Sequence, residues 1–586
     1  MVEHKSKESQ KKKVGTRRPI SKFPIVGIGA SAGGFEAFEL FFKNMPPNSG
    51  MAFVVIQHLD PTRIGIMPEL LQRMTTMKVF QATDRIKLMI NCVYVIPPNK
   101  SMTIVKGSLH LSDLLETHGL RLPIDTFFRS LAADSSDRSI GVILSGMGSD
   151  GSLGVKAIKE KNGVVLVQDP VTAKFDGMPS SAVDAVIADI VAPAEQLPRK
   201  LIEYLNFMPL VDPVSDMELS NKSNIDKIII LLREFSGHDF SLYKKNTLFR
   251  RIERRKGIHQ IERIGEYVDF LMKNPSEVEI LFKELLIGVT NFFRDTAVWD
   301  MLKHKILPDL VNTLPNGYVL RAWIPACSTG EEAYSLAIVF REVMEQLKKP
   351  KNITLQIFAT DLDHDAVEKA RRGFFGSNIV AEVSPQRISQ FFIHEGEGFR
   401  ISSAIREMIV FAPQNVIKDP PFTKLDILSC RNMLIYMEPM LQKKLITLFG
   451  YSLNSSGLMI LGSAETIGNL ISGFSEVEGK LKIFKKKPGG KLNELIDFPS
   501  SFYHNRAIVG KNEKPVAREV DNIQSVADQV LLQRFSPASV LVNENGDILY
   551  ITGRTGSYLE PAAGKANWNI HAMAKDGFKQ VLPGAF

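Results

Sequence analysis

Two short turns made of small residues constrain the fold of this chain more than any other feature. One spans Gly27–Gly34 and reads Gly-Ile-Gly-Ala-Ser-Ala-Gly-Gly, and the other spans Ala326–Glu332 and reads Ala-Cys-Ser-Thr-Gly-Glu-Glu. Each follows a short apolar run and precedes a stretch with helical patterning. In open α/β sheets, ligands bind at this junction, outside the carboxyl end of a strand. Because the turns are far apart in the sequence, we expect two separate sites that catalyse two different reactions.

Short apolar runs bounded by turn residues recur on both sides of a helical region. Such runs are typical of strands buried on both faces of a parallel sheet. They are Ile25–Ile28, Ala52–Ile56, Val93–Ile96, Ile140–Leu144, Val164–Val167, Tyr318–Ile324, Thr354–Phe358 and Leu425–Leu428. The predicted fold class is therefore α/β, with two doubly wound parallel-sheet domains, a small all-helical subdomain between them and a partial α+β segment at the C-terminal end.

The distribution of prolines, glycines and charges predicts the domain boundaries. Ile225, Ile228, Ile229 and Leu232 follow the i, i+3, i+4, i+7 spacing of a buried helix face, which places the helical subdomain. The predicted order is a basic tail at 1–20, an α/β domain at 21–205, a linker at 206–222, helices at 223–290, a second α/β domain at 291–487, a linker at 488–520 and a final segment at 521–586.

Bulk composition excludes several classes of protein. The net charge of +8 is mild for 586 residues, and the sequence contains no basic stripe interleaved with aromatics, so we expect no nucleic-acid partner. No apolar run is long enough to span a bilayer, and the charged N-terminal residues do not resemble a signal peptide. Three cysteines give no disulfide framework. These features predict a cytoplasmic protein without direct membrane insertion.

The first turn presents Ser31 as a candidate nucleophile. A serine hydroxyl needs a base to take its proton, and the base needs a partner that orients it. His58 follows the run that ends at Gln57, and Asp150 lies in the Gly-rich turn after the run Ile140–Leu144. Taken singly, each signal has a simpler explanation: phosphate binding, a structural histidine or ordinary turn chemistry. Together they predict a Ser-His-Asp triad at one edge of a parallel sheet.

This region strongly resembles the catalytic domain of the CheB methylesterase family over about residues 22–205. The matching motifs are Gly27–Gly34, Ile56–Leu59, Tyr94–Pro98, Leu144–Gly151 and Gly177–Pro179. The resemblance implies Ser31 as nucleophile, His58 as general base, Asp150 as its orienting partner and the Met147 backbone N–H near the oxyanion. Ala32 replaces the more common threonine, which we expect to tune activity. Twenty preceding residues cannot form the family's receiver domain, so we expect no phosphorylation gate in cis.

The second turn combines a backbone cradle with acidic residues. Glu331 and Glu332 open a helix, and Asp361 ends the next apolar run, where an acid can bind a ribose hydroxyl. Acids suit S-adenosylmethionine, which carries an ammonium group, a sulfonium and a ribose. The alternative is that glutamates in a first helical turn only complement the helix dipole. A nicotinamide cofactor is disfavoured because no Gly-x-Gly-x-x-Gly motif occurs at the turn.

Residues 223–487 resemble the CheR chemotaxis methyltransferase family. The matching motifs are Gly288–Asp295, Cys327–Ser335, Ala359–Asp363 and Leu428–Tyr436. The resemblance implies S-adenosylmethionine as cofactor and no metal ligands. It places Arg294 and Tyr436 nearest the transferred methyl group. It also implies a donor pocket lined by Thr290, Arg294, Glu332, Asp361, Asn415 and Asn432.

A basic helix is predicted over Thr247–Arg255, with Leu248, Phe249 and Ile252 on one face. The opposite face carries four arginines, and because like charges at i,i+4 destabilise an isolated helix, their clustering suggests an acidic partner. An ordinary solvated face is the alternative. The resemblance to CheR proteins, which dock a basic helix on chemoreceptor helices bearing glutamates, favours binding to a receptor through Arg250, Arg251, Arg254 and Arg255. Residues 374–410 take the place of that family's receptor-tail-binding β subdomain.

The C-terminal segment contains two candidate strands around an Asn/Gly turn, between Ser539 and Ile551, and resembles the start of a PAS sensor domain. The whole chain is interpreted as a bifunctional enzyme that methylates protein glutamates and hydrolyses their methyl esters. Its expected partner is a methyl-accepting chemoreceptor or related coiled-coil protein, with a downstream sensor kinase module as a further partner. The alternatives are a catalytically silent sensory scaffold, deamidation of receptor glutamines and hydrolysis of small-molecule esters.

Overall fold

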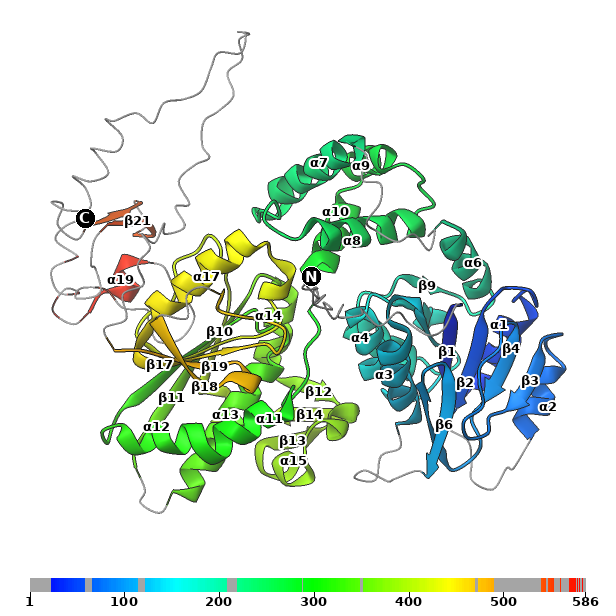
Figure 1. Cartoon of the computed structure of the whole chain (residues 1–586), viewed down its shortest axis with the longest axis horizontal. Helices are drawn as coiled ribbons and strands as arrows, with labels where there is room; N and C mark the ends of the chain where they lie inside the picture. The colour runs from blue at the N-terminus through cyan, green and yellow to red at the C-terminus, as the bar shows by residue number, and fades with distance from the viewer. Residues whose placement is uncertain are drawn as a thin grey trace, which may run out of the picture. The chain divides into compact units, whose positions relative to one another are not determined.

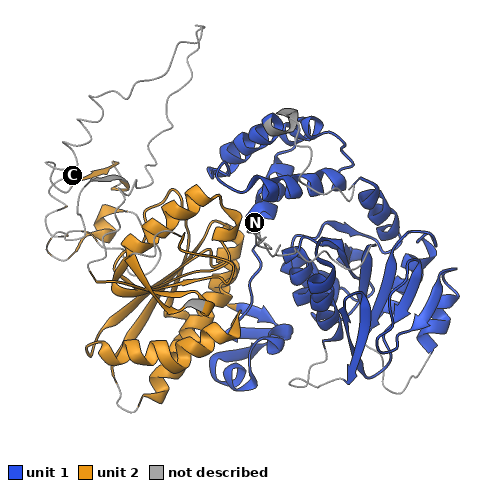
Figure 2. Ribbon diagram, in the orientation of Figure 1, with its two compact units in different colours: residues 1–292, 374–401 blue, residues 293–373, 402–586 orange. Residues whose placement is uncertain are grey.

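The computed structural model describes residues 23–57, 66–113, 122–207, 219–286, 288–347, 351–468 and 473–488, with scattered residues between 539 and 582. The chain divides into two compact units (Figure 2). The first contains residues 1–292 and 374–401, and the second contains residues 293–373 and 402–586. The predicted basic tail lies outside the described residues, as does most of the segment predicted to be PAS-like.

The first unit is built on a seven-stranded sheet in which all neighbouring strands are parallel (Figure 1). Its strands, in spatial order, are β3 (Lys78–Gln81), β4 (Cys92–Val95), β2 (Ala52–Gln57), β1 (Ile25–Ala30), β7 (Ser139–Ile143), β8 (Val164–Gln168) and β9 (Ile190–Ala192). β1 pairs with β2 on one side and with β7 on the other, so the connections reverse direction there. The carboxyl end of β1 is therefore the topological switch point of the sheet.

Helices cover both faces of this sheet because alternate residues of each strand point to opposite sides. Val26 and Ile28 belong to one hydrophobic cluster, whereas Ile25 belongs to the other. The helices on the first side are α1 (Gly34–Lys43), α2 (Ile66–Gln72) and α6 (Leu197–Phe207), and those on the second are α3 (Pro123–Ser135), α4 (Ser152–Glu160) and α5 (Gly177–Ala185). A hairpin of β5 (Lys100–Val105) and β6 (Ser108–Asp113) packs against α3.

The predicted helical subdomain is confirmed as four helices of the first unit: α7 (Leu219–Ser236), α8 (Lys245–Ile258), α9 (Ile264–Lys273) and α10 (Pro275–Leu286). The apolar stripe Ile225, Ile228, Ile229 and Leu232 of α7 is buried against residues of the other three helices. The same unit includes a small antiparallel insertion, formed by β12 (Phe374–Gly376), α15 (Pro385–Phe391), β13 (Phe392–Glu395) and β14 (Gly398–Ile401).

The second unit contains another seven-stranded sheet. Its spatial order is β15 (Ile409–Pro413), β11 (Thr354–Asp361), β10 (Val319–Pro325), β16 (Leu425–Cys430), β17 (Leu453–Leu461), β19 (Ile483–Lys486) and β18 (Phe474–Glu478). The first five strands are parallel, and the last two form an antiparallel edge. β10 lies between β11 and β16, so this sheet has its switch point at the carboxyl end of β10.

Helices of the second unit follow the strands of its sheet. They include α11 (Thr296–Met301), α12 (Leu307–Thr313), α13 (Glu331–Gln346), α14 (His364–Arg372) and α17 (Pro439–Ser452). Near the C-terminus, β20 (Ser539–Val542) and β21 (Ile548–Thr552) form the predicted hairpin, followed by the short helix α19 (Ile570–Met573). These fragments do not support the finer prediction of a PAS domain. Every helix within the described residues is too short or too polar to cross a bilayer.

Candidate active sites

Ser31 lies at the switch point of the first sheet, directly after β1. Gly33 takes a left-handed conformation with φ of +70°, and α1 begins at the next residue. The Ser31 N–H donates to the carbonyl oxygen of Ser145 at 3.1 Å, which joins the turn after β1 to the turn after β7. A Cβ atom on Gly146 would lie 3.0 Å from the Cβ of Ser31 and 2.3 Å from the sulfur of Met178. The two turns can approach so closely because Gly146 has no side chain.

Asp150 is fixed by the first turn of α3. Its carboxylate is buried and accepts the N–H of Ile124 at 3.0 Å and that of Asp125 at 2.9 Å. Unpaired N–H groups at a helix N-terminus stabilise negative charge. These bonds therefore orient the side chain of Asp150 after β7, at the same sheet edge as Ser31. His58 lies outside the described residues. Met147 is 60% exposed, and its predicted oxyanion role stays a prediction.

Sequence reasoning missed Asp125, which is buried beside Asp150. Burial and the charge of Asp150 raise the pKa of Asp125 well above its usual value. Its Oδ1 accepts the N–H of Gly154 at 2.6 Å. Asp125 could not be singled out from the sequence, because it lies in the first turn of a helix that begins at a proline, as many helices do.

The second small-residue turn is held around the carboxylate of Asp361, at the switch point of the second sheet. Ala326, Ser328 and Gly330 all have positive φ. The Ser328 N–H donates to Oδ2 of Asp361 at 2.7 Å, and the Asp363 N–H donates to Oδ1 at 2.9 Å. Burial raises the pKa of Asp361 to about 6, although these hydrogen bonds oppose the shift. The acid therefore changes charge close to neutral pH.

Glu332, in the first turn of α13, is tied to the end of β16. Ser429 Oγ donates to its Oε1 at 2.6 Å, and Nη1 of Arg431 lies 3.5 Å from its Oε2. Burial raises the pKa of Glu332, and the charge of Arg431 opposes this shift. Arg431 also donates to the carbonyl oxygen of Arg294 at 2.8 Å and to the carboxylate of Asp295 at 2.6 Å. It therefore joins the segment before α11 to the sheet edge.

Ser429 and Arg431 were not predicted as site residues, although both lie in the motif Leu428–Tyr436. The only available signal was their position at the carboxyl end of a buried apolar run next to Asn432.

Two predicted asparagines also lie at this edge. Asn415 follows β15, and its Oδ1 accepts the N–H of Ile417 at 3.1 Å. Asn432 follows β16 with φ of +62°, and its N–H donates to Glu465 at 3.1 Å. Glu332, Asp361, Asn415 and Asn432 thus all lie at or just beyond the carboxyl ends of parallel strands of this sheet, and their role as a donor pocket, which the resemblance to CheR proteins implies, stays a prediction.

The other predicted residues are placed less completely. Arg294 and Tyr436 are half-buried residues of the second unit, and Thr290 is half-buried in the first. The proximity of Arg294 and Tyr436 to a transferred methyl group stays a prediction, as does the role of Thr290 in the pocket.

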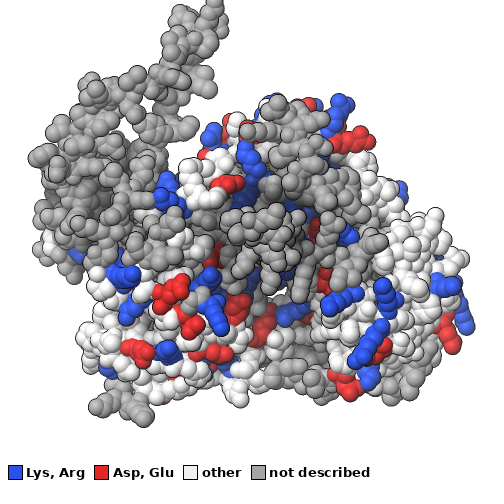
Figure 3. Space-filling view, in the orientation of Figure 1, with Lys and Arg blue, Asp and Glu red and all other residues white. Residues whose placement is uncertain are grey.

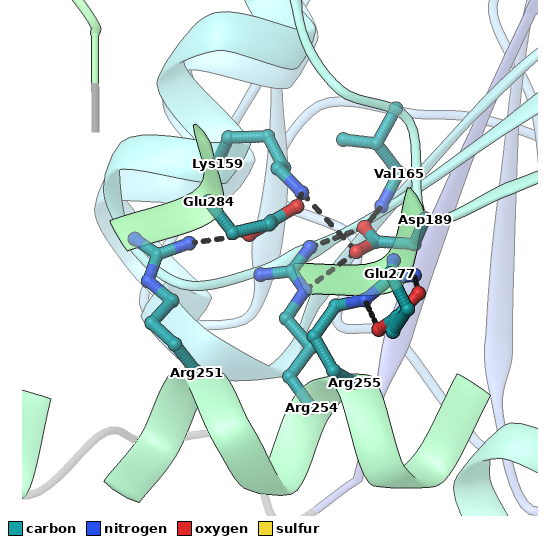
Figure 4. Close-up of polar contacts among 8 residues, drawn as sticks. All are labelled: Lys159, Val165, Asp189, Arg251, Arg254, Arg255, Glu277 and Glu284. Carbon is teal, nitrogen blue, oxygen red and sulfur yellow. Dashed lines mark hydrogen bonds and ion pairs between the residues drawn. The ribbon is translucent and has the colours of Figure 1, made fainter. Parts of the chain in front are cut away.

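Three of the four arginines of α8 that the resemblance predicts to bind a receptor do not lie on an exposed face. Arg251, Arg254 and Arg255 are buried, and only Arg250 is exposed (Figure 4). Arg251 pairs with Glu284, Arg254 with Asp189 and Arg255 with Glu277. The acidic partners inferred from the like charges therefore exist within the chain itself. On the face drawn in Figure 3, described Lys and Arg residues are interspersed with Asp and Glu.

Three family models match the chain. Residues 26–201 match the CheB methylesterase model, and residues 223–286 match the all-alpha domain of CheR methyltransferase. Residues 288–483 match the S-adenosylmethionine-binding domain of CheR methyltransferase. The residues assigned to the two sheet edges fall within the first and third matches. The acidic groups at the second edge, Glu332 and Asp361, fit the ammonium group and ribose of this cofactor.

Curated relatives that are methylesterases or methyltransferases each match only a part of this chain. A putative protein-glutamate methylesterase/protein-glutamine glutaminase of Leptospira interrogans is 33% identical over 31% of this chain and 94% of its own length. A chemotaxis protein methyltransferase of Listeria monocytogenes is 30% identical over 40% of this chain and 86% of its own length. An uncharacterized 104.1 kDa protein of Rhodobacter capsulatus is 32% identical over 86% of this chain. The alignment spans only 55% of that relative.

The pKa of Asp361 predicts a pH-dependent affinity for S-adenosylmethionine. An ionised carboxylate accepts ribose hydroxyls, and protonation below pH about 6 removes an acceptor. We expect the association constant to fall with decreasing pH, by up to about tenfold per pH unit below that pKa. Calorimetric titrations of the wild-type chain between pH 5 and 8 measure this fall. Asp361→Asn should bind weakly with a flat profile, and an unchanged slope in this variant would contradict the assignment.

The two backbone hydrogen bonds of Asp150 predict a local loss of stability. Asp150→Asn replaces one acceptor oxygen by a buried amide group that faces an N–H donor, which costs about 1–3 kcal/mol. Hydrogen–deuterium exchange should become faster in α3. Asp137→Asn, an exposed change just beyond the same helix, is the control and should leave α3 protected. Equal protection of α3 in both variants would show that these bonds do not position Asp150.

Proposed function

This chain belongs to the CheB methylesterase and CheR methyltransferase families, joined in one polypeptide, and we propose that it both forms and hydrolyses glutamate methyl esters on a chemoreceptor-type protein. The substrate would be a methyl-accepting receptor or a related coiled-coil protein. One observation carries the proposal: each of the two sheets has, at its switch point, the residue types that one of these reactions needs.

The esterase reaction follows from the turn after β1. Ser31 Oγ attacks the ester carbonyl, and its proton passes to a base, for which His58 is the candidate. The base then protonates the departing methanol, and water hydrolyses the acyl-serine to free the glutamate carboxylate. Asp150 supports an imidazolium because its own position is fixed by α3. The Met147 N–H is the proposed donor to the oxyanion.

The transferase reaction needs alignment more than base catalysis. S-adenosylmethionine supplies an electrophilic methyl group on a sulfonium centre. A receptor glutamate, with a pKa near 4.3 in its free form, is already ionised at neutral pH and can attack without deprotonation. Asp361 and Glu332 are the proposed ligands of the ribose and the ammonium group, with Thr290, Asn415 and Asn432 lining the rest of the pocket. Arg294 would hold the acceptor carboxylate, and Tyr436 would lie beside the methyl group.

We place the domains at 21–205, 223–290 and 291–487, and we propose a cytoplasmic protein that works with a downstream sensor kinase module. A silent scaffold is the alternative function. It is disfavoured because Asp150 is held in a costly buried position that binding alone does not require. Deamidation of receptor glutamines proceeds through the same acyl-serine. Activity towards small-molecule esters without any receptor would favour the alternative that the natural substrates are small-molecule esters.

Independent inactivation of the two sites tests the proposal. Ser31→Ala removes the nucleophile, so methanol release from a methylated receptor fragment should fall by at least a thousandfold, on the order of a nucleophile deletion. Transfer of tritium from labelled S-adenosylmethionine to the fragment should persist in this variant. Asp361→Ala should show the converse pattern.

Mass-spectrometric counting of methyl groups on the fragment measures both directions in one experiment. Loss of both activities in either variant would contradict two separate sites. Absence of both activities in the wild-type chain, with donor binding retained, would favour the scaffold.

A further inference from the structure

The insertion of residues 374–401 belongs to the first unit and is anchored there by aromatic rings (Figure 2). Phe292 packs edge-on against Phe375 of β12, with ring centroids 4.8 Å apart, and against Phe392 of β13 at 5.8 Å. Phe292 is buried, and its N–H donates to Oε2 of Glu382 at 3.0 Å. These contacts tie the insertion to the chain segment that follows α10.

Two polar residues of the insertion contact the turn that carries Asp150. They are Ser377 and Asn378, which directly follow β12. Nδ2 of Asn378 donates to Ser152 Oγ at 2.7 Å, and Ser377 Oγ lies 3.2 Å from Ser149 Oγ. Asn378 and Ser152 are 6% and 5% exposed, so their hydrogen bond is shielded from water. The two contacted serines flank Asp150 on either side.

The contacted turn has little rigidity of its own. Gly148 and Gly151 have φ of +82° and +96°, and glycine is the residue with the greatest backbone freedom. Ser152 Oγ closes the turn by donating to the carbonyl oxygen of Ser149 at 2.8 Å. Because the Asn378 amide donates to this same Oγ, the hydroxyl hydrogen of Ser152 must point away from the amide and towards Ser149. Asn378 therefore reinforces the hydrogen bond that closes the turn.

The insertion also contacts α3, the helix whose first N–H groups bind the Asp150 carboxylate. Oε1 of Glu382 accepts from Nη2 of Arg129 at 2.9 Å. The Glu382 side chain is 6% exposed, and that of Arg129 is 40% exposed. Arg129 lies one helical turn beyond Asp125, whose N–H donates to Asp150 at 2.9 Å. The insertion thus reaches both elements that fix Asp150, namely the turn on which it lies and the helix that binds its carboxylate.

We infer that the insertion is a positioning element of the esterase site, with Asn378 and Glu382 as positioning residues for Asp150. The inference rests on the proposed function, because it concerns ester hydrolysis at Ser31. Both residues act through Asp150, which supports the charge that develops on the catalytic base. The same turn carries Met147, the proposed oxyanion donor. A segment within the methyltransferase match thus sets the rate of the esterase, and hydrolysis is fast only when the insertion is in place.

Asn378→Asp tests the contact with the turn. The new carboxylate has the same size but no N–H to donate to Ser152 Oγ, so Asp150 should lose part of its alignment. In the full chain, acylation of Ser31 by p-nitrophenyl acetate, followed by the release of p-nitrophenolate, should slow about five- to tenfold, as the loss of one hydrogen bond implies. Hydrogen–deuterium exchange should become faster in residues 146–152 and in the first turn of α3.

A matched control and a second variant accompany this change. Gln386→Glu makes the same amide-to-carboxylate replacement on an exposed residue of the insertion, so acylation and exchange should stay at the wild-type level. Glu382→Gln removes the charge that pairs with Arg129. It should slow acylation about two- to fivefold, because a partly exposed ion pair contributes less than a buried hydrogen bond.

A double-mutant cycle separates positioning from a general structural effect. If Asn378 acts through Asp150, Asn378→Asp should cause no further loss of acylation rate in an Asp150→Ala background. A structural effect elsewhere would slow acylation by the same factor in both backgrounds, and that result would overturn the inference. Wild-type acylation together with wild-type exchange in Asn378→Asp would overturn it as well.

The exchange measurement keeps this inference distinct from the proposed function. If Ser31→Ala releases p-nitrophenolate as fast as the wild-type chain, the esterase assignment fails, and faster exchange in Asn378→Asp still supports the positioning of Asp150 by the insertion. If acylation depends on Ser31 but is unchanged by Asn378→Asp and by Glu382→Gln, the positioning role fails and the esterase assignment stands.

Discussion

Both candidate sites depend on one constraint of parallel sheets, which is that a chain reversing its winding direction leaves a crevice at the carboxyl end of the first strand. β1 lies between β2 and β7, and β10 lies between β11 and β16. In each case the central strand pairs with a neighbour on both sides, and the turns that follow it carry the candidate site residues. Small residues in those turns allow the backbone to approach the neighbouring turn, as Gly146 does beside Ser31. Function is thus concentrated where strand pairing ends.

Much of this arrangement could be predicted because it is encoded locally. Apolar runs predicted the strands β1, β2, β4, β7, β8, β10, β11 and β16, and the stripe of α7 predicted the helical subdomain. The end of an apolar run placed Asp361 at a sheet edge, whereas Asn432 was predicted only from the resemblance to CheR proteins. Strands such as β3 and β9 escaped prediction because they are short edge strands with partly exposed residues. The turns beside Ser31 and Asp361 could be predicted from their neighbouring residues alone, without knowledge of contacts between distant parts of the chain.

The charged contact of α8 could not be predicted for the opposite reason. Asp189 and Glu284 lie far from Arg254 in sequence, and no periodic pattern links a single aspartate before one strand to a helix of another domain. The sequence showed that the arginines needed carboxylates, but it could not show which ones. Burial alone would raise the pKa of Asp189, yet Arg254 and Lys159 hold it well below its usual value. Within this contact, Arg254 and Asp189 neutralise each other's charge across two domains.

This pairing makes the contact more sensitive to its geometry than an apolar interface of the same size would be. Hydrophobic surfaces tolerate small shifts, whereas a buried bidentate pair loses most of its compensation when its geometry is lost. Asp189 also pairs with Lys159 of its own domain, and Glu284 also pairs with Arg251 of its own subdomain, whereas Arg254 takes its carboxylate from the other domain. The position of α8 therefore depends on Asp189 more than the position of Asp189 depends on α8.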